Sequence, residues 1–333
     1  MKKISNVLLF ISFTVLLTLT PVNGVLAATN TSSSGPNGYR LYPVRTDLVL
    51  NKGSTDIVTV YIQNATSDVE NLQTVVDDFE APTNETGNPA LLLNGATAPS
   101  HSLKQFATVL NPKFTLQPNQ QEAVNVEIKI PPNAESGGYY GAVRFAPIGP
   151  GGNKNVNLSA SVASLILLTV PGNLIQRVYV SGFGVAQGNS TVTHAFFFSN
   201  KNLNAIVRFK NIGNVQEEPF GKILLKKGTT VLSSVGVNTA NPPGNVLPDS
   251  IRAFSAKLTK VGWFGKYTIE GNFGYGNKGQ LLMAQASFYV IPIAVIIITL
   301  LIILFILFLI FGLPRLIRAY NRRVIARASR RQQ

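Results

Sequence analysis

The chain has 333 residues, of which 45% are hydrophobic and only 13% are charged, and its formal net charge is +14. Such a chain can bury hydrophobic cores, which excludes wholesale disorder. The absence of cysteine excludes disulfides, zinc fingers and thiol nucleophiles, and two histidines leave little material for a metal site or a catalytic triad. We therefore expect a non-enzymatic protein with no cofactor and no bound metal.

The positive charge is concentrated at the two ends of the chain. Seven arginines follow residue 314 and two lysines lie near the N-terminus, whereas residues 28–287 carry a net charge of only +5. This distribution indicates membrane topology rather than a surface for nucleic acid. No nucleic-acid partner is expected.

Residues 1–27 have the parts of a secretory signal peptide. Two lysines precede an apolar run from Val7 to Leu19, and small residues around Ala27 end the segment. The sequence leaves open whether this segment is cleaved or kept as an anchor, and in either case the chain that follows is exported. Residues 28–38 are polar and predict a flexible lead-in.

Residues 39–171 predict a first β-sandwich domain, and residues 172–287 predict a second. The apolar residues of Val58–Ile62 alternate with polar neighbours, and so do those of Val124–Ile130. A period of two with one polar face is typical of half-buried antiparallel strands. Turn-forming Pro, Gly and Asn residues separate these runs, which favours a mainly β fold with two immunoglobulin-like sandwiches.

A weak internal repeat supports two copies of one plan. Each copy has a strand that ends in asparagine, a turn with leucine and proline, an alternating strand, and then a glycine and a tyrosine that open the next strand. The asparagines are Asn64 and Asn211, and the tyrosines are Tyr139 and Tyr267. We expect the tyrosine rings to fill the ends of the two cores. The other residues expected to point inward are Val143, Phe145, Val207, Phe209 and Ile269.

Candidate ligand-binding residues lie in the first predicted sandwich. Residues 80–112 alternate little and are long for a loop, so this stretch is expected to determine specificity. It contributes His101 and Phe106. Tyr140 and Arg144 should face outward from their strand, and exposed aromatic rings with polar neighbours are how shallow glycan sites bind. Core or hairpin packing is the alternative for these aromatic residues.

The most concentrated acidic residues are Asp77, Asp78 and Glu80, with Glu85 nearby in the loop. Together they offer the oxygen ligands that Ca²⁺ prefers. However, Asp77 and Asp78 would point to opposite faces of a regular strand. A solvated strand end or a cross-strand ion pair with an arginine is therefore favoured over a metal site.

The segment from Val290 to Leu313 has no charged residue and is dominated by Ile, Leu, Val and Phe. At about 1.5 Å per residue it spans about 36 Å, enough for a hydrocarbon core of about 30 Å. We expect a transmembrane helix over residues 288–313 and a basic cytoplasmic tail over residues 314–333, because basic residues beside a span stay in the cytoplasm. This places a single-pass protein in the cell membrane with both sandwiches outside. The arginines expected to contact the membrane surface are Arg315, Arg318, Arg322, Arg323 and Arg327.

The run FTLQPNQQEAVNVEIKIPPNAESGGYYGAVRFAP (Phe114–Pro147), which follows VTVYIQN (Val58–Asn64), resembles the peptidoglycan-binding domain of the WxL-interacting protein family. The resemblance covers residues 40–170 in sequence and the rest of the chain in layout. These bacterial surface proteins have a signal peptide, two immunoglobulin-like domains and a C-terminal membrane helix. The second half departs from the family's partner-binding domain. The resemblance implies binding to cell-wall peptidoglycan or to another surface protein, and it implies no reaction.

Together these features favour a non-catalytic, membrane-anchored cell-surface binding protein, with a role in adhesion. Its expected partners are the lipid bilayer and either peptidoglycan or a second surface protein. An accessory or scaffold subunit of a membrane or cell-envelope complex is the alternative. A hydrolase is disfavoured, because general acid–base catalysis needs a positioned acid and base that the sequence does not offer.

Overall fold

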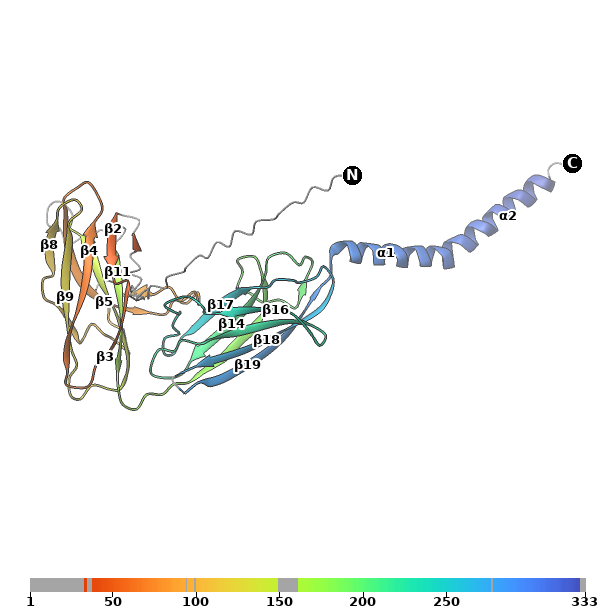
Figure 1. Cartoon of the computed structure of the whole chain (residues 1–333). Coiled ribbons are helices and arrows are strands. Elements are labelled where there is room, and N and C mark those ends of the chain that lie inside the picture. The colour runs from red at the N-terminus through yellow and green to blue at the C-terminus, as the bar shows by residue number, and fades with distance from the viewer. Residues whose placement is uncertain are drawn as a thin grey trace, which may run out of the picture.

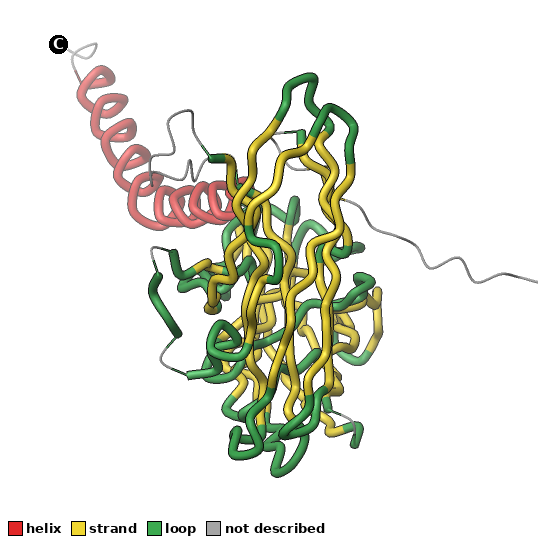
Figure 2. Tube along the Cα trace, turned by 90° about the vertical axis from the view of Figure 1, so that its left-hand side faces the viewer, coloured by secondary structure: helices red, strands yellow, loops and turns green. Residues whose placement is uncertain are grey.

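The computed structural model shows four β-sheets followed by a long helix (Figure 1). It describes residues 33–34, 38–93, 95–98, 100–148, 161–276 and 278–329. The predicted signal peptide lies outside these residues, as does most of the predicted lead-in. Within the described chain, helix is confined to the C-terminal segment, and the rest is strands joined by loops (Figure 2).

The first two sheets enclose one hydrophobic core, and we call them the N-terminal half. Their strands are β1 (Ser33–Ser34), β2 (Tyr39–Tyr42), β3 (Arg45–Val49), β4 (Thr55–Asn64), β5 (Glu70–Glu80), β6 (Ala90–Leu91), β7 (Ala107–Val109), β8 (Lys113–Leu116), β9 (Gln121–Lys129), β10 (Gly137–Pro147) and β11 (Val162–Val170). One sheet has the order β1-β2-β4-β9-β7, and the other has the order β3-β11-β10-β5-β6, with β8 beside β5. The inward residues of both sheets form a single cluster.

The other two sheets enclose a second core, and we call them the C-terminal half. Their strands are β12 (Val178–Gln187), β13 (Phe196–Phe197), β14 (Leu203–Asn211), β15 (Phe220–Lys227), β16 (Thr230–Val237), β17 (Ile251–Lys257), β18 (Gly265–Tyr275) and β19 (Gln280–Val290). The sheet orders are β12-β14-β17 and β13-β19-β18-β15-β16. In Figure 1 the strands of the two halves run in different directions.

Both halves follow the same strand plan. In each half a short early strand pairs in parallel with the last strand, β3 with β11 and β13 with β19. The remaining ladders between described strands are antiparallel. The predicted mainly β, immunoglobulin-like sandwich architecture is therefore confirmed.

The predicted inward residues are buried in both cores. The two tyrosines of the repeat occupy equivalent places, because each lies near the start of a long strand and donates its hydroxyl to a carbonyl just upstream. Tyr139 donates to Glu135 at 2.9 Å, and Tyr267 donates to Phe264 at 3.2 Å. The other predicted inward residues that are buried are Val143, Phe145, Val207, Phe209 and Ile269.

A buried asparagine closes the end of a central strand in the C-terminal half. Asn211 is the last residue of β14, and its side-chain amide donates to the carbonyls of Val215 at 2.7 Å and Val246 at 2.9 Å. Its carbonyl oxygen accepts the backbone N–H of Gly213 at 2.8 Å. One side chain thus satisfies three backbone groups that would otherwise lose their hydrogen bonds on burial.

The N-terminal half repeats this arrangement at Asn64, the last residue of β4. The Asn64 amide donates to the carbonyls of Asp68 at 2.7 Å and Leu116 at 3.3 Å, and its oxygen accepts the Thr66 N–H at 2.9 Å. The asparagine found at the end of each copy of the sequence repeat therefore has the same structural role in both halves. This agreement supports two copies of one plan.

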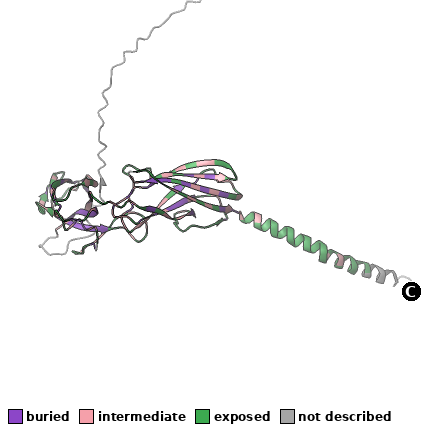
Figure 3. Ribbon diagram, turned by 90° about the horizontal axis from the view of Figure 1, so that it is seen from below, coloured by how far each residue is buried: buried purple, intermediate pink, exposed green. Residues whose placement is uncertain are grey.

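The C-terminal helix projects away from the sheets with its apolar side chains uncovered (Figure 3). It consists of α1 (Ile293–Leu307), a π-helical turn (Phe308–Gly312) and α2 (Leu313–Ser329). The segment Ile293–Asn321 is long and apolar enough to cross a membrane. The helix begins at Ile293 rather than at residue 288, because Phe288 and Val290 still alternate into the core on β19.

The helix bends at the predicted exit from the membrane and continues beyond it. Pro314 has no N–H to donate, and the π-helical turn directly before it lets the helix continue in a new direction. Arg315 and Arg318 are exposed on α2, and Arg322, Arg323 and Arg327 follow on the same helix.

Replacing Asn211 by alanine should lower the free energy of unfolding by about 2–4 kcal/mol, because the carbonyls of Val215 and Val246 lose their buried donor. Asn64→Ala should have an effect of similar size. The control is Asn71→Ala, which removes an exposed amide bonded to one threonine hydroxyl and should cost less than about 1 kcal/mol. Urea denaturation of the full chain in detergent measures the three values, and equal losses for all three would contradict the assigned role.

Candidate functional site

The two halves meet at a junction built from segments that are far apart in the sequence. The N-terminal half contributes the start of β3, the end of β5 and the loop over residues 81–89. The C-terminal half contributes residues 213–218, which lead into β15, and residues 240–252, which lead into β17. Because the junction brings polar, charged and apolar groups together in one concave region, it is the candidate functional site.

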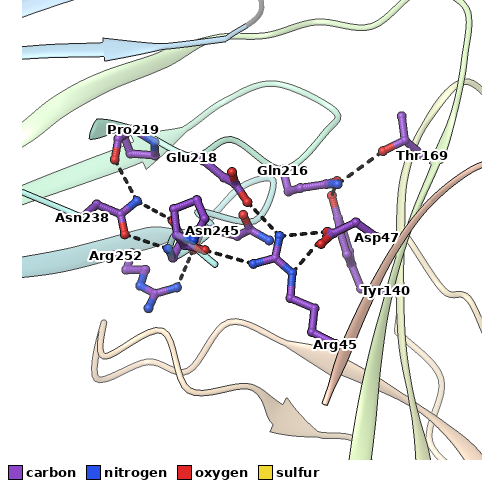
Figure 4. A network of polar contacts seen from close by, with 12 residues as sticks. Arg45, Asp47, Tyr140, Thr169, Gln216, Glu218, Pro219, Asn238, Asn245 and Arg252 are labelled. Carbon is purple, nitrogen blue, oxygen red and sulfur yellow. Dashed lines mark hydrogen bonds and ion pairs between the residues drawn. The ribbon is translucent and has the colours of Figure 1, made fainter. Parts of the chain in front are cut away.

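Arg45, the first residue of β3, bridges the two halves (Figure 4). Its guanidinium pairs with Asp47 at 2.8 Å on its own strand and with Glu218 at 2.7 Å in the C-terminal half. It also donates to the Pro243 carbonyl at 2.9 Å. Burial alone lowers the pKa of Arg45, but the two carboxylates outweigh that effect and raise it. The positive charge of Arg45 is therefore fully compensated.

A second set of contacts ties β10 and β11 to the loop before β15. The Tyr140 hydroxyl donates to the side-chain oxygen of Gln216 at 2.9 Å, and the Gln216 amide donates to Thr169 at 3.3 Å (Figure 4). The N–H of Gly138 donates to the Asn214 carbonyl at 2.8 Å. These hydrogen bonds fix the loop of the C-terminal half against the N-terminal half.

The loop over residues 81–89 reaches across the junction to the edge strand β17. The Glu85 carboxylate pairs with Arg208 at 2.6 Å, and the Glu85 carbonyl accepts the Ala253 N–H at 2.9 Å. Glu85 has a φ of +59°, a conformation that L residues adopt rarely. The predicted specificity stretch therefore covers part of an open sheet edge, which sequence patterning gave no sign of.

A cleft of about 500 Å³ lies between these contacts. Most of its lining is apolar, and its charged lining residues are Arg45, Arg252 and Glu80. The apolar residues that matter most for its shape come from both halves and are Phe79, Leu165, Leu167, Pro242, Pro243 and Leu247. A concave apolar surface with a few polar groups is the usual form of a binding site.

Arg252 differs from Arg45 because none of the described acidic side chains pairs with it. Its Nη1 donates to the Asn245 carbonyl at 2.8 Å, and its Nε is buried without a hydrogen-bond partner. Burial and the nearby positive charge of Arg45 lower the pKa of Arg252. An anionic group in the cleft would remove this electrostatic penalty and complete the hydrogen bonding of the guanidinium.

Two glycines make room for the Arg252 guanidinium. A Cβ atom on Gly87 would lie 2.1 Å from Nε of Arg252, and one on Gly244 would lie 2.7 Å from its Nη2. The ring of Phe254 supports the same guanidinium, with 5.1 Å between Cζ and the ring centroid. A side chain at either glycine would therefore displace the Arg252 guanidinium from its present position.

Two of the predicted ligand-binding residues are buried, and a ligand role for them remains a prediction. Tyr140 and Arg144 do point away from the first core, as expected, but both are buried. Tyr140 packs with Phe79 and with Leu247 of the C-terminal half, which covers this face. Arg144 forms a buried ion pair with Asp77. The prediction of exposed side chains was therefore wrong, because it ignored the cover supplied by the distant loop.

The other two predicted residues lie together in a separate hollow of about 610 Å³, which Tyr139 also lines. Phe106 packs edge-on against the Tyr139 ring at 4.9 Å. His101 has a φ of +61°, and its Nδ1 lies 2.6 Å from the Gly138 carbonyl. A ligand role for His101 and Phe106 remains a prediction.

The acidic residues of β5 serve structural contacts. Asp77 pairs with Arg144, as the favoured alternative predicts. Asp78 points the other way and accepts the backbone N–H groups of Ala98 and Lys104, each at 3.0 Å, which fixes the long loop to the core. Within the described residues no cluster of three or more His, Cys, Asp or Glu could hold a metal ion.

Sequence reasoning missed Arg45, Arg252 and Glu217. Glu217 is buried, hydrogen-bonds through its backbone to Val246 in both directions, and leaves its Oε1 without a partner. Burial raises the pKa of Glu217 to about 7, and the neighbouring Glu218 adds to this effect. These residues carry no local signal, because their neighbours come from remote parts of the chain.

Comparisons with known proteins identify structures of similar architecture. No protein-family model matches the chain, and no curated protein matches it. The class 5 fimbrial chaperone CfaA has 14% identity and a TM-score of 0.37, covering 76% of this chain and 99% of its own. The CupB2 chaperone of Pseudomonas aeruginosa has 13% identity and a TM-score of 0.31, and the match covers 73% of this chain and 97% of the chaperone. The CsuC–CsuE chaperone–tip subunit complex of Acinetobacter baumannii has 11% identity and a TM-score of 0.35, and the match covers 74% of this chain and 97% of the other chain.

These comparisons correct the interpretation of the sequence. The resemblance to the WxL-interacting family was wrong, since the similar structures are fimbrial chaperones and no family model matches. The predicted function as a membrane-anchored peptidoglycan-binding protein is therefore also wrong. Alternation followed by glycine and tyrosine is common to many β-sandwiches and does not separate these families.

Glu217→Gln should stabilise the protein more at pH 8 than at pH 5. The folded pKa of about 7 lies above the ordinary value of 4.5, so the native state binds the extra proton and loses stability as pH rises between these values. Glutamine removes that loss, and the stability gain should increase by about 1–3 kcal/mol between pH 5 and pH 8. Urea denaturation in detergent measures it. Glu127→Gln on β9 is the control, and an equal pH dependence of both variants would refute the assignment.

Proposed function

We propose that the protein binds a segment of another polypeptide in the cleft between its two halves, with a carboxylate of that segment held by Arg252. The observation that carries this proposal is the guanidinium of Arg252, which is half-buried in the cleft, has no acidic partner among the described residues, and has a fully buried Nε without a hydrogen-bond partner. A charge in such a place is costly unless an opposite charge joins it.

The remaining features of the cleft support a polypeptide as the occupant. Its walls are mostly apolar and contain Pro242 and Pro243, which suit the side chains of an extended segment. Arg45 is already neutralised by Asp47 and Glu218, so it stiffens the junction and leaves Arg252 to select the ligand. A polypeptide carboxylate can satisfy both the charge and the geometry of a guanidinium.

The test uses pairs of extended apolar peptides that differ only in a C-terminal carboxylate or amide. The full chain in detergent should bind the carboxylate form about tenfold more tightly, the value of one charge-assisted hydrogen bond. Arg252→Gln should remove this difference. Arg40→Gln, a change of an exposed arginine on β2, should preserve it. Fluorescence anisotropy measures the affinities, and equal binding of both peptides or no binding of either would contradict the proposal.

We further propose that residues 39–171 and 172–287 are two domains held outside the cell membrane by the C-terminal helix. The support is the run of uncovered apolar side chains in Ile293–Asn321, because exposure of so long an apolar segment to water is unfavourable. The arginines after it favour a cytoplasmic tail, and Arg315 and Arg318 are then placed at the headgroups of the inner leaflet.

The native chain has no cysteine, so single cysteines can report this topology. Lys52→Cys in the exposed turn before β4 should react with a membrane-impermeant maleimide on intact cells. Gln332→Cys in the basic tail should react only after the cells are lysed. Labelling of Gln332→Cys on intact cells, or protection of Lys52→Cys, would refute the topology.

A further inference from the structure

The end of the C-terminal half from which the helix leaves has no flexible linker. Strand β19 runs to Val290, and the N–H of Ile291 donates to the Phe197 carbonyl at 2.8 Å, so that α1 begins two residues later at Ile293. Two residues reach at most about 7 Å. The headgroup layer on each side of a bilayer is about 5–8 Å thick. If α1 spans the membrane, the loops at this end lie at headgroup depth.

Four exposed aromatic side chains occupy these loops. Trp263 is 67% exposed and Phe264 is 45% exposed in the loop between β17 and β18, and Phe196 and Phe198 are 62% and 60% exposed around β13. Strand pairing places both loops beside the start of the helix, because Gly265 and Phe197 are both paired with Val290. Large apolar side chains this exposed are unfavourable in water and mark an interaction surface.

The two loops are held in a defined arrangement. The Asn200 amide donates to the Val261 carbonyl at 2.8 Å, which joins one loop to the other. Phe196 stacks on Tyr289 of β19 with 5.3 Å between ring centroids. The aromatic groups are therefore presented together, next to the helix, without the cost of ordering them on contact.

The same end is basic. Residues 188–202, 226–230 and 257–266 contain no aspartate or glutamate. Lysine side chains are exposed at five positions in these segments, namely Lys201, Lys227, Lys257, Lys260 and Lys266. Three of the four acidic residues of the C-terminal half lie at the opposite end, by the junction, and the fourth is paired with Lys226 at 2.6 Å.

We propose that this end of the C-terminal half is a membrane-contact surface that rests in the outer headgroup layer. Trp263, Phe264, Phe196 and Phe198 enter the interface, where aromatic rings are enriched in membrane proteins. The exposed lysines bind the phosphates of anionic lipids. The inference rests on the proposed topology of the helix and is independent of the proposed peptide site.

The consequence is a fixed orientation of the cleft. Strand β18 is 11 residues long and runs from the membrane-contact surface to the junction, so it holds the cleft about 35 Å from the lipid. If the C-terminal half rotated freely about the start of the helix, the distance and angle of the cleft relative to the membrane would vary. Contact between the C-terminal half and the membrane fixes the orientation of the cleft.

Trp263 is the single tryptophan of the chain, so its fluorescence tests the contact directly. The full chain is reconstituted into vesicles of phosphatidylcholine and phosphatidylglycerol, with or without brominated acyl chains. We expect blue-shifted emission, quenching by brominated lipid and protection from iodide. Emission typical of water, quenched by iodide and unaffected by bromine, would overturn the proposal.

Variants test the part played by charge. Lys260→Gln and Lys266→Gln together should lower the ratio of lipid-inserted to water-exposed Trp263 by about fivefold per lysine, and high salt should do the same. The control pair is Lys113→Gln and Lys129→Gln in the N-terminal half, which should leave the ratio unchanged. An equal effect of both pairs would refute the role of these lysines. Alkaline carbonate extraction separates the two proposals, since release of the chain refutes the membrane span itself.

Discussion

The junction depends on the hydrogen bonds of one buried asparagine. Asn211 joins the carbonyl of Val215 to that of Val246, and these two carbonyls belong to the two loops through which the C-terminal half meets the N-terminal half. Gln216, which binds Tyr140, follows directly after Val215, and Leu247, which packs on Tyr140, follows directly after Val246. Asn64 makes the same bonds in the N-terminal half, where they close a sandwich end. The same set of asparagine hydrogen bonds therefore closes the end of a sandwich in the N-terminal half and holds the loops of the junction in the C-terminal half.

Short-range periodicity made the fold predictable, because each strand shows its inward face in its own sequence. Val207 and Phe209, for example, alternate with Arg208 and Lys210 and are buried as expected. The same reasoning failed at Tyr140 and Arg144, where the direction of the side chains was predicted correctly and their exposure was not. A period of two identifies which face a residue lies on, but what covers that face is decided by a loop about 100 residues away.

The candidate site was beyond sequence reasoning for the same physical reason. Arg45 and Arg252 are ordinary strand residues in isolation, and they differ only because Glu218 and Asp47 reach the first and no described carboxylate reaches the second. The carboxylates of Asp47 and Glu218 neutralise Arg45, which joins the two halves, whereas Arg252 is the residue that we propose binds a ligand. Glycine at positions 87 and 244 leaves room for the Arg252 guanidinium, since a side chain at either position would displace it.

The C-terminal half is chemically different at its two ends, and this difference relates the candidate site to the proposed membrane contact. Acidic Glu217 and Glu218 lie by the junction, whereas lysines and the exposed Trp263 lie where the helix begins. A soluble sandwich has no reason to separate its charges in this way, because scattered charges keep a surface soluble equally well. The separation is what a rigid spacer requires, with one end suited to anionic lipid and the other to a partner domain. Strands that run the whole distance between the ends, such as β18, make the spacer stiff.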